Sequence, residues 1–344
     1  MRGRVTAVLS ILLLSLSLPA AAQCNWTPRY SGQFRTTALD VSVDNDFLWL
    51  ATGYGVQLLQ RSGTAVRPLH AVALPGSTRV VRANGSGLAY AGSGSRLYVL
   101  RRNGSRIEIV RFVESGGTIQ DLEIHQGTDL FAATSKGAAH YQLVPADTPV
   151  KSSAIFATSS QNVGAIAISG ANLYTADGDS SVEIFNISIP SLAQKTDQID
   201  TFPAATTVHA TSDNFLYVSD RFGQNTDVIS GKTRLARLPF GATSFAPSAS
   251  RVHFVAGPDR TLRAVDFNSL TQPAEIFETQ LPPTDGSDNA IHAIARQLDT
   301  IYVAAGDIGL VILDAKPLAK PYPLAGYTTS AMTSSVVAGD RAWL

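Results

Sequence analysis

Eight aromatic residues recur along the chain at nearly equal spacing, each inside a short apolar run. Successive members are 37 to 48 residues apart, and most intervals are 41 or 43 residues. The members are Trp49, Tyr90, Phe131, Tyr174, Tyr217, Phe254, Tyr302 and Trp343. This period matches the roughly 40–50 residues of a four-stranded propeller blade. The spacing therefore predicts a repeat protein in which each unit buries its apolar faces against its neighbours.

The clearest copy of the unit spans residues 289–317, NAIHAIARQLDTIYVAAGDIGLVILDAKP. Apolar runs at 292–294 and 301–304 lead across a Gly-containing turn into a third run at 310–313. The alternation in the second run, and the stop at Asp314 and Pro317, are typical of β-strands. First strands are also expected at 39–43, 122–124 and 166–168, and third strands at 56–59, 97–100, 182–185 and 262–265. The less regular segment after each third strand is expected to be the outer strand.

The predicted fold is all-β, a closed β-propeller of four-stranded antiparallel blades, because no helical periodicity interrupts the repeats. One domain, residues 23–344, is expected to hold all repeats of about 42 residues each. Eight blades are expected, with seven as the alternative. Thr328–Leu344 has the pattern of the first two strands of a last, incomplete blade. Together with an outer strand at 29–37, it would close the ring and hide the sheet edges.

The N-terminal residues have the composition of an export signal. Arg2 and Arg4 supply a positive start, residues 5–18 an apolar core, and residues 19–22 a small-residue cleavage region. About 14 apolar-rich residues are too few to span a membrane, which needs roughly 20. We therefore expect a cleaved signal peptide at residues 1–22 and a bacterial protein that is secreted or periplasmic, with no membrane span.

Cys24, the single cysteine, follows the predicted cleavage point. Lipoprotein signals also end at a cysteine, but they normally place Gly, Ala or Ser directly before it. Gln23 occupies that place here, which argues against a lipid anchor at Cys24. One cysteine cannot form a disulfide within the chain, so stability must come from the packed strands.

The charge balance argues against a surface specialised for polyanions. Lys and Arg number 27, Asp and Glu number 27, and the formal net charge is zero. Binding to nucleic acid or anionic lipid needs clustered Lys and Arg, and the sequence has no basic run. No nucleic-acid partner is therefore expected.

The third strand of the clearest copy, Leu310–Asp314 with the sequence LVILD, resembles the defining motif of the LVIVD-repeat family. Residues 301–304 resemble that family's aromatic strand, and residues 306–309 resemble its connecting loop. Weaker versions occur at 173–174 with 182–186, and at 263–266. The resemblance covers roughly residues 37–344 and implies a bacterial, exported β-propeller. It brings no catalytic residues to carry over, because the family is mostly uncharacterised.

Ligands of propellers bind on one loop face or over the central channel, so polar residues there are candidates. The candidate loop-face residues are Asp177, Asp179, Asp220, Arg221, Asp259, Arg260 and Asp307, with His209 and His292 on first strands. Aspartates in Gly-containing turns commonly cap backbone N–H groups, which gives them a structural explanation. The histidines are expected to face the channel or to pack between blades.

The sequence offers little for metal or nucleophilic chemistry. A lactonase-like Ca²⁺ site needs six to eight oxygen ligands. The first strands supply only Asp121 and Glu123, with Asp40 beside another. A serine elbow, a metal-spaced His pair and a phosphate-binding Gly loop are missing from the sequence. We therefore predict no catalytic residues, no metal and no cofactor.

Three classes of function remain open. Regular repeats without a convergent acidic or histidine site favour a non-catalytic scaffold that binds a protein or a cell-surface component. The alternative is a propeller enzyme, either a lactonase-like hydrolase or a quinone-cofactor dehydrogenase. The quinone type would need stacking tryptophans, and the chain has only Trp26, Trp49 and Trp343. The third class is a structural module of a longer adhesin-like chain.

Overall fold

The computed structural model describes residues 37–343 with short gaps. Outside the description lie residues 1–36, 63–64, 153–155, 157, 160–161, 179–180, 202–204, 212, 221–223, 248–250, 282, 315–321, 328–335, 339–340 and 344. The predicted signal peptide, Cys24 and nearly all of the expected outer strand at 29–37 therefore lie outside the described residues. Within them, the regular elements are strands, apart from one 3₁₀ turn at Pro190–Leu192. The all-β prediction is confirmed.

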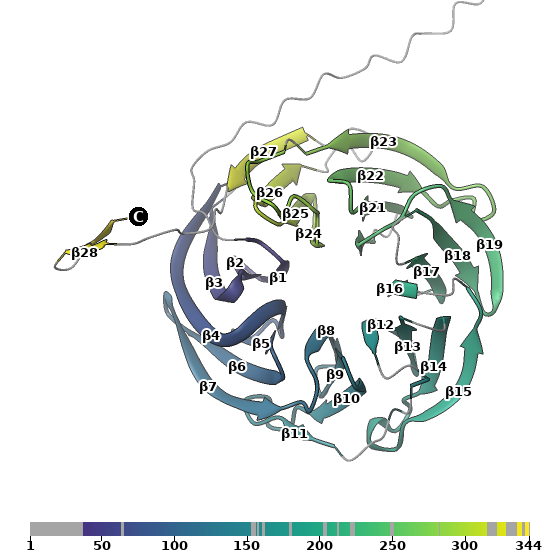
Figure 1. Ribbon diagram of the computed structural model, residues 1–344, viewed down its shortest axis with the longest axis horizontal. Helices are drawn as coiled ribbons and strands as arrows, with labels where there is room; N and C mark the ends of the chain where they lie inside the picture. The colour runs from purple at the N-terminus through teal and green to yellow at the C-terminus, as the bar shows by residue number, and fades with distance from the viewer. Residues whose placement is uncertain are drawn as a thin grey trace, which may run out of the picture.

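Antiparallel sheets are arranged around a central channel (Figure 1). One sheet has seven strands: β1 (Asp40–Asp44), β2 (Phe47–Ala51), β3 (Gly53–Ser62), β4 (Ala65–Ala83), β5 (Leu88–Ser93), β6 (Arg96–Asn103) and β7 (Arg106–Glu114). The next two sheets have four strands each: β8 (Ile119–His125), β9 (Asp129–Thr134), β10 (Gly137–Gln142) and β11 (Val150–Lys151), then β12 (Val163–Ser169), β13 (Asn172–Asp177), β14 (Ser181–Asn186) and β15 (Gln194–Ile199).

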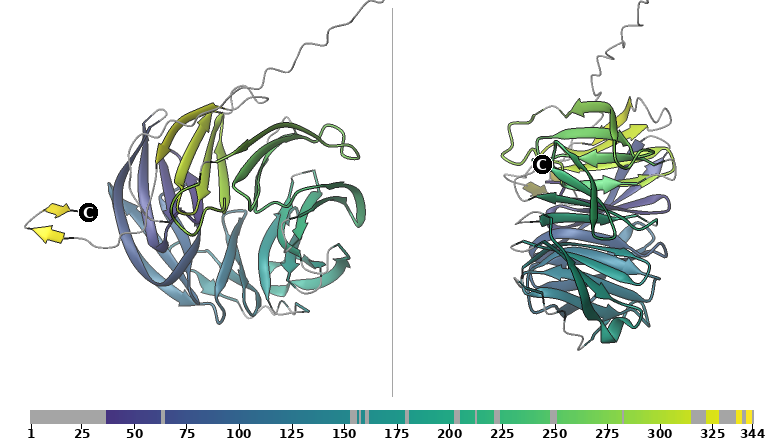
Figure 2. Two further views of the ribbon diagram at one scale, coloured as in Figure 1. Left: turned by 45° about the horizontal axis from the view of Figure 1, so that its top comes forward. Right: turned by 90° about the vertical axis from the view of Figure 1, so that its right-hand side faces the viewer.

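Three further four-stranded sheets complete the ring. They contain β16 (Ala205–Ala210), β17 (Phe215–Asp220), β18 (Thr226–Ser230) and β19 (Thr233–Leu238), then β20 (Ser244–Ala246), β21 (Val252–Ala256), β22 (Thr261–Asp266) and β23 (Ala274–Gln280), then β24 (Ala293–Gln297), β25 (Thr300–Ala305), β26 (Gly309–Asp314) and β27 (Tyr322–Tyr327). The first strand of each sheet lies nearest the channel, and Figure 2 shows neighbouring sheets stacked around the ring.

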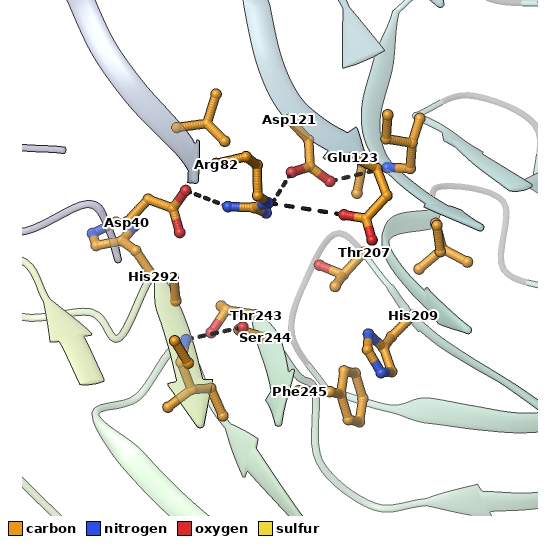
Figure 3. A pocket seen from close by; sticks show the side chains of 18 of the residues that line it. Asp40, Arg82, Asp121, Glu123, Thr207, His209, Thr243, Ser244, Phe245 and His292 are labelled. Atoms are coloured by element: carbon orange, nitrogen blue, oxygen red, sulfur yellow. Dashed lines mark hydrogen bonds and ion pairs between the residues drawn. The ribbon is translucent and has the colours of Figure 1, made fainter. Parts of the chain in front are cut away.

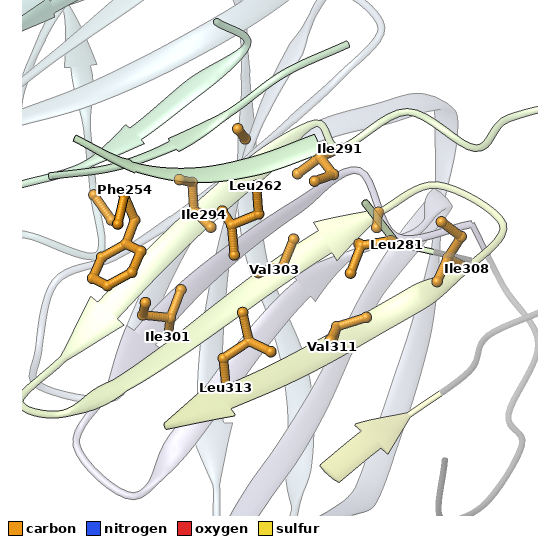
Figure 4. Packing of buried hydrophobic residues seen from close by; sticks show 14 of the residues in the cluster. Phe254, Leu262, Leu281, Ile291, Ile294, Ile301, Val303, Ile308, Val311 and Leu313 are labelled. Carbon is orange, nitrogen blue, oxygen red and sulfur yellow. The ribbon is translucent and has the colours of Figure 1, made fainter. Parts of the chain in front are cut away.

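Seven of the eight recurring aromatic residues occupy equivalent places, as predicted. They lie on the second strands β2, β5, β9, β13, β17, β21 and β25, and each is at most 6% exposed. The eighth, Trp343, lies in a short strand pair outside the ring. Each of the seven belongs to an apolar cluster shared by two neighbouring units. The Trp49 cluster contains Val81 and Leu100 of the second unit within the seven-stranded sheet. The Phe254 cluster contains Ile301 and Val311 of the next sheet (Figure 4). The repeat register derived from the aromatic spacing is confirmed.

Burial on both faces explains the composition of the second strands. A strand covered by sheets on both sides is apolar at nearly every position instead of alternating. In β25 the five residues from Ile301 to Ala305 are all buried. The long outer strand β7, in contrast, exposes most of its residues. The core therefore consists of the interfaces between sheets.

The turns between first and second strands repeat as well. Asn45, Gln126, Asn214, Arg251 and Leu298 each adopt a positive φ, between 52° and 62°, at this turn. Asparagine tolerates this left-handed conformation better than most residues. Asn45 and Asn214 therefore suit this turn, while arginine and leucine fill the same backbone position in later units.

The expected blade count is wrong. The described residues form five separate four-stranded sheets, neither eight nor seven, together with the seven-stranded sheet and one pair of short strands. The physical reason is β4, which runs for 19 residues without a break. Its first part pairs with β3 and its last part with β5, and Thr78 pairs with both. Two units of the repeat are thereby merged into one sheet.

The first and last sheets do not meet through the shared last blade that was predicted. β27 completes the sheet of β24–β26, while β28 (Val336–Ala338) and β29 (Arg341–Trp343) pair with each other and lie outside the ring (Figure 1). In the described part of the chain no sheet is shared by the two ends. Instead, Ala38 and Gly306 exchange two backbone hydrogen bonds of 2.9 Å. Tyr302 packs there with Leu48 and Leu59 of the first sheet. We call this junction the seam.

Candidate functional site

The first strands enclose a cavity of about 520 Å³ at the centre of the ring, which we call the channel. Its lining comes from β1, the end of β4, β8, β12, β16, β20 and β24 (Figure 1). Because every sheet contributes its first strand, side chains far apart in sequence face one another across the channel.

Four charged side chains gather on one side of the channel (Figure 3). The Arg82 guanidinium, on β4, donates to Asp40 on β1 at 2.5 Å and to Asp121 on β8 at 3.0 Å. Glu123, also on β8, lies 3.8 Å from Arg82 Nε, which is an ion pair beyond hydrogen-bond distance. Arg82 therefore joins three consecutive first strands. We call these four residues the Arg82 cluster.

The carboxylates of the cluster also bind backbone N–H groups of the next first strand. Asp40 Oδ2 accepts from the Val81 N–H at 2.8 Å. Asp121 Oδ2 accepts from the Ile166 N–H at 3.1 Å. Similar links join Ser42 Oγ with the Ala83 N–H and Ser244 Oγ with the Ile294 N–H. Side chains thus tie adjacent sheets together near the channel.

Burial shifts the acids of the cluster towards the neutral form. Loss of water contact raises the pKa of both Asp40 and Asp121, although the charge of Arg82 opposes the shift. Burial, with the like charges of Asp121 and Asp40 adding to it, raises the pKa of Glu123 to about 7. The Glu123 side chain is 40% exposed, so its carboxyl group still meets channel water.

Arg82 itself stays cationic. Burial lowers the pKa of Arg82, but the three neighbouring carboxylates more than offset this effect and raise it above its ordinary value. Arg82 is thus a cation shared by three carboxyl groups, and burial favours the protonated form of each of these groups.

The opposite side of the channel carries aromatic and hydroxyl side chains. His209 on β16 stacks on Phe245 of β20, with ring centroids 5.6 Å apart. Burial, and then the neighbouring His253, lower the pKa of His209 to about 4, so the ring is neutral at pH 7. The hydroxyl side chains of Thr207 and Thr243 lie on the same side (Figure 3).

Both histidines predicted on first strands line the channel. His292, directly before β24, places its Nε2 2.8 Å from a carboxylate oxygen of Asp288. Asp288 in turn donates its backbone N–H to Asp307 Oδ2 at 2.9 Å, and Asp307 Oδ1 accepts from the Thr37 hydroxyl at 2.9 Å. His292 and Asp307 therefore belong to one network at the seam.

Two other predicted loop residues, Asp220 and Asp259, do not line the channel. Asp220 accepts from the Gln224 N–H at 2.9 Å, and Asp259 accepts from the Thr261 N–H at 3.2 Å. Both carboxylates thus cap the backbone of their own turns, as the structural explanation of turn aspartates requires.

Asp177 and Arg260 do not line the channel either. Asp177, at the end of β13, is fully buried, and Arg260 donates to the Leu281 carbonyl at 3.2 Å. Asp179 and Arg221 lie outside the described residues.

Arg82 is the charged channel residue that was not predicted from the sequence. A signal was present, because Arg82 and Glu123 are 41 residues apart, one repeat length, and both interrupt apolar first strands. Asp40 and Asp121 are related by two repeat lengths in the same way. Charges at equivalent positions of neighbouring first strands must face one another around a channel.

Metal-binding and membrane-spanning features are both missing from the described part of the chain. There, no three His, Cys, Asp or Glu side chains are grouped so that they could hold a metal ion. In the same residues, no helix has the length and apolar character needed to cross a membrane.

Comparison with known proteins identifies the fold. The ring resembles the crystal structure of Saccharomyces cerevisiae Sqt1, with a TM-score of 0.66 and 10% identity over 90% of this chain and 91% of that one. It also resembles the WD40 beta propeller domain of Doa1, with a TM-score of 0.66 and 12% identity over 83% of this chain and 94% of that one. The chain is a β-propeller. No family model and no curated protein matches the sequence.

Proposed function

We propose that this β-propeller is an exported, non-catalytic scaffold that binds a protein or cell-surface partner over its channel. The observation that carries the proposal is the exposure of Glu123 and its distance from Arg82. Its carboxylate is 40% exposed and 3.8 Å from Arg82, whereas Asp40 and Asp121 take the closer hydrogen bonds of that guanidinium. Glu123 is thus the member of the Arg82 cluster that is open to a new partner.

A basic side chain of the partner is the group that fits this carboxylate. Lys or Arg pairs with a carboxylate through short, charge-assisted hydrogen bonds. Two other cationic side chains, Arg79 and Arg296, also line the channel. Within the described residues, neither of them forms an ion pair with Glu123, whose only ion-pair partner there is Arg82.

The test is a binding assay with short synthetic peptides, labelled with a fluorophore and measured by anisotropy. We expect peptides with Lys or Arg to bind the wild-type protein, and their acidic counterparts to bind much more weakly. Glu123→Gln should weaken binding of the basic peptides about twofold to fivefold, as loss of a partly exposed charge pair does. Glu108→Gln, on the exposed outer strand β7, is the matched control and should change nothing.

Two results would contradict the proposal. One is equal binding of basic peptides to the wild type and to Glu123→Gln. The other is turnover: a metal analysis and a lactone-hydrolysis screen should be run on the same preparation. Stoichiometric Ca²⁺ together with hydrolysis would favour the lactonase-like alternative.

Export and family membership are part of the proposal. The leader-like residues 1–22 and the LVILD sequence at Leu310–Asp314 support a bacterial protein of the LVIVD-repeat type. In this proposal one propeller domain, residues 23–344, follows the leader. No lipid is attached at Cys24.

A further inference from the structure

Leu298 is the most exposed of the large apolar side chains in the described part of the chain. It is 85% exposed and lies in the turn between β24 and β25. Its φ is 53°, in the left-handed region that a bulky side chain adopts only at a cost in free energy. Leu298 is therefore unfavourable in two ways, because its apolar surface meets water and its backbone is strained.

The equivalent turns of other units contain residues that suit these conditions better. The left-handed residues there are Asn45, Gln126, Gly170, Asn214 and Arg251. None of them exposes a large apolar side chain, and asparagine and glycine also tolerate the backbone conformation. Folding thus favours a polar residue or glycine at this place, whereas a partner that covers the side chain would favour leucine.

These turns form one face of the ring, which we call the turn face. Each first strand ends there, so residues close before a turn lie near this face. Glu123 is three residues before Gln126, whereas Asp121 is five residues before it. Glu123 is therefore the acid of β8 that lies nearer the turn face.

The turn of Leu298 is joined to the wall of the channel. Arg296, which lines the channel, donates from Nε to the Leu298 carbonyl at 2.9 Å. Glu123 is presented from β8 and Leu298 from the end of β24, and these two strands lie on different sides of the channel (Figure 1). A partner that contacts both residues must therefore cross the mouth of the channel.

We infer that the partner docks on the turn face as an extended peptide segment that carries one basic and one apolar side chain. The inference rests on the proposed function: the basic side chain pairs with Glu123, and the apolar one covers Leu298. Successive residues of an extended segment advance about 3.3 Å, so a few residues can cross the mouth. A flat lipid surface fits less well, because it cannot reach a carboxylate inside the channel.

Fluorescence anisotropy with labelled synthetic peptides tests the inference. One series joins a lysine to a leucine through serine spacers of increasing length, and a second series has serine in place of the leucine. The wild type should bind the best leucine peptide about tenfold more tightly than its serine counterpart, as burial of one leucine side chain predicts. Leu298→Asn should remove this difference, whereas Glu123→Gln should weaken binding of both peptides by the same factor.

Thermal unfolding separates a binding role of Leu298 from a structural one. Leu298→Asn should raise the Tm, because asparagine tolerates the positive φ and exposes less apolar surface. A residue needed for folding would instead lower the Tm when replaced. Tyr54→Asn is the matched control, since Tyr54 is 73% exposed near the start of β3, on the face opposite the turn face. This control should leave binding of both peptides unchanged.

The outcomes distinguish this inference from the proposed function. Equal binding of the leucine and serine peptides by the wild type, or a lower Tm for Leu298→Asn, would overturn the role of Leu298 and leave the proposed function standing. Binding that does not depend on the lysine would refute the proposed function itself. Co-sedimentation of the wild type, but not of Leu298→Asn, with phosphatidylcholine vesicles would overturn the assignment to a peptide in favour of a lipid surface.

Discussion

Replacing Arg82 by methionine removes the cation that three carboxylates share. Methionine keeps most of the length of the side chain, so the change is mainly one of charge. Asp40 and Asp121, whose side chains are 7% and 19% exposed, would keep their backbone N–H bonds but lose their only ion pair in the described structure. Breaking a buried ion pair on one side costs about 3–5 kcal/mol, because a buried charge is left uncompensated.

We expect the loss for Arg82→Met at pH 7 to lie near the lower limit, about 3 kcal/mol, because channel water reaches Arg82 itself. The loss should shrink as the pH falls towards about 4.5. Without Arg82 the folded-state pKa of each carboxyl rises further above its unfolded value. The folded protein then binds more protons than the unfolded chain over that window, so stability falls as pH rises.

Urea unfolding at both pH values measures these free energies. Arg96→Met is the matched control, because Arg96 forms an exposed ion pair with Glu114 at 2.7 Å. The control should leave the free energy of unfolding nearly unchanged at either pH. Equal destabilisation by the two substitutions, or a loss for Arg82→Met that is the same at both pH values, would refute the reasoning about the cluster.

Three further expectations concern the whole protein. Wild-type stability should fall as pH rises from the ordinary glutamate pKa of about 4.3 to about 7, because the folded state raises the pKa of Glu123. Glu123→Gln should flatten this part of the urea-unfolding profile. Tyr174→Ala should cost about 3–5 kcal/mol in the same assay, whereas Tyr54→Ala, at a side chain that is 73% exposed, should cost under about 0.5 kcal/mol; similar losses would undermine the repeat register. N-terminal sequencing of protein exported by a bacterial host should begin at Gln23, and an intact Met1 would disprove the leader.

The packed strands were predictable because burial on both faces leaves a mark in the sequence. The second strands are continuous apolar runs that contain one large aromatic residue, and the third strands have a similar pattern. The spacing of these apolar runs gives the order of the units. Neither the runs nor their spacing depends on contacts between distant residues, so both can be seen in the sequence. Tyr90, Phe131 and Tyr217 could therefore be placed correctly from the sequence alone.

The unbroken course of β4 was not predictable in the same way. Pro75 and Gly76 lie within it, and such a dipeptide usually marks a turn. In the structure Gly76 takes a φ of 97°, yet the strand continues and changes its partner at Thr78. Local turn preferences favour a break here, but pairing with β3 on one side and β5 on the other overrides them.

Only part of the charged side of the channel could be predicted from the sequence. Asp121 and Glu123 were recognised as acids on a first strand, but their partner is 39 to 41 residues away. Contact between them depends on how neighbouring sheets face the channel, which single-strand patterns do not contain.

The seam between the first and last sheets is held together differently from the merged seven-stranded sheet. Separating the first and last sheets would break the two backbone hydrogen bonds between Ala38 and Gly306 and open a single apolar interface. Separating the first two units would require unzipping the hydrogen-bonded ladders of β4. A guest too wide for the channel would therefore spread the ring at the seam or at another interface between separate sheets, while the first two units move together as one body.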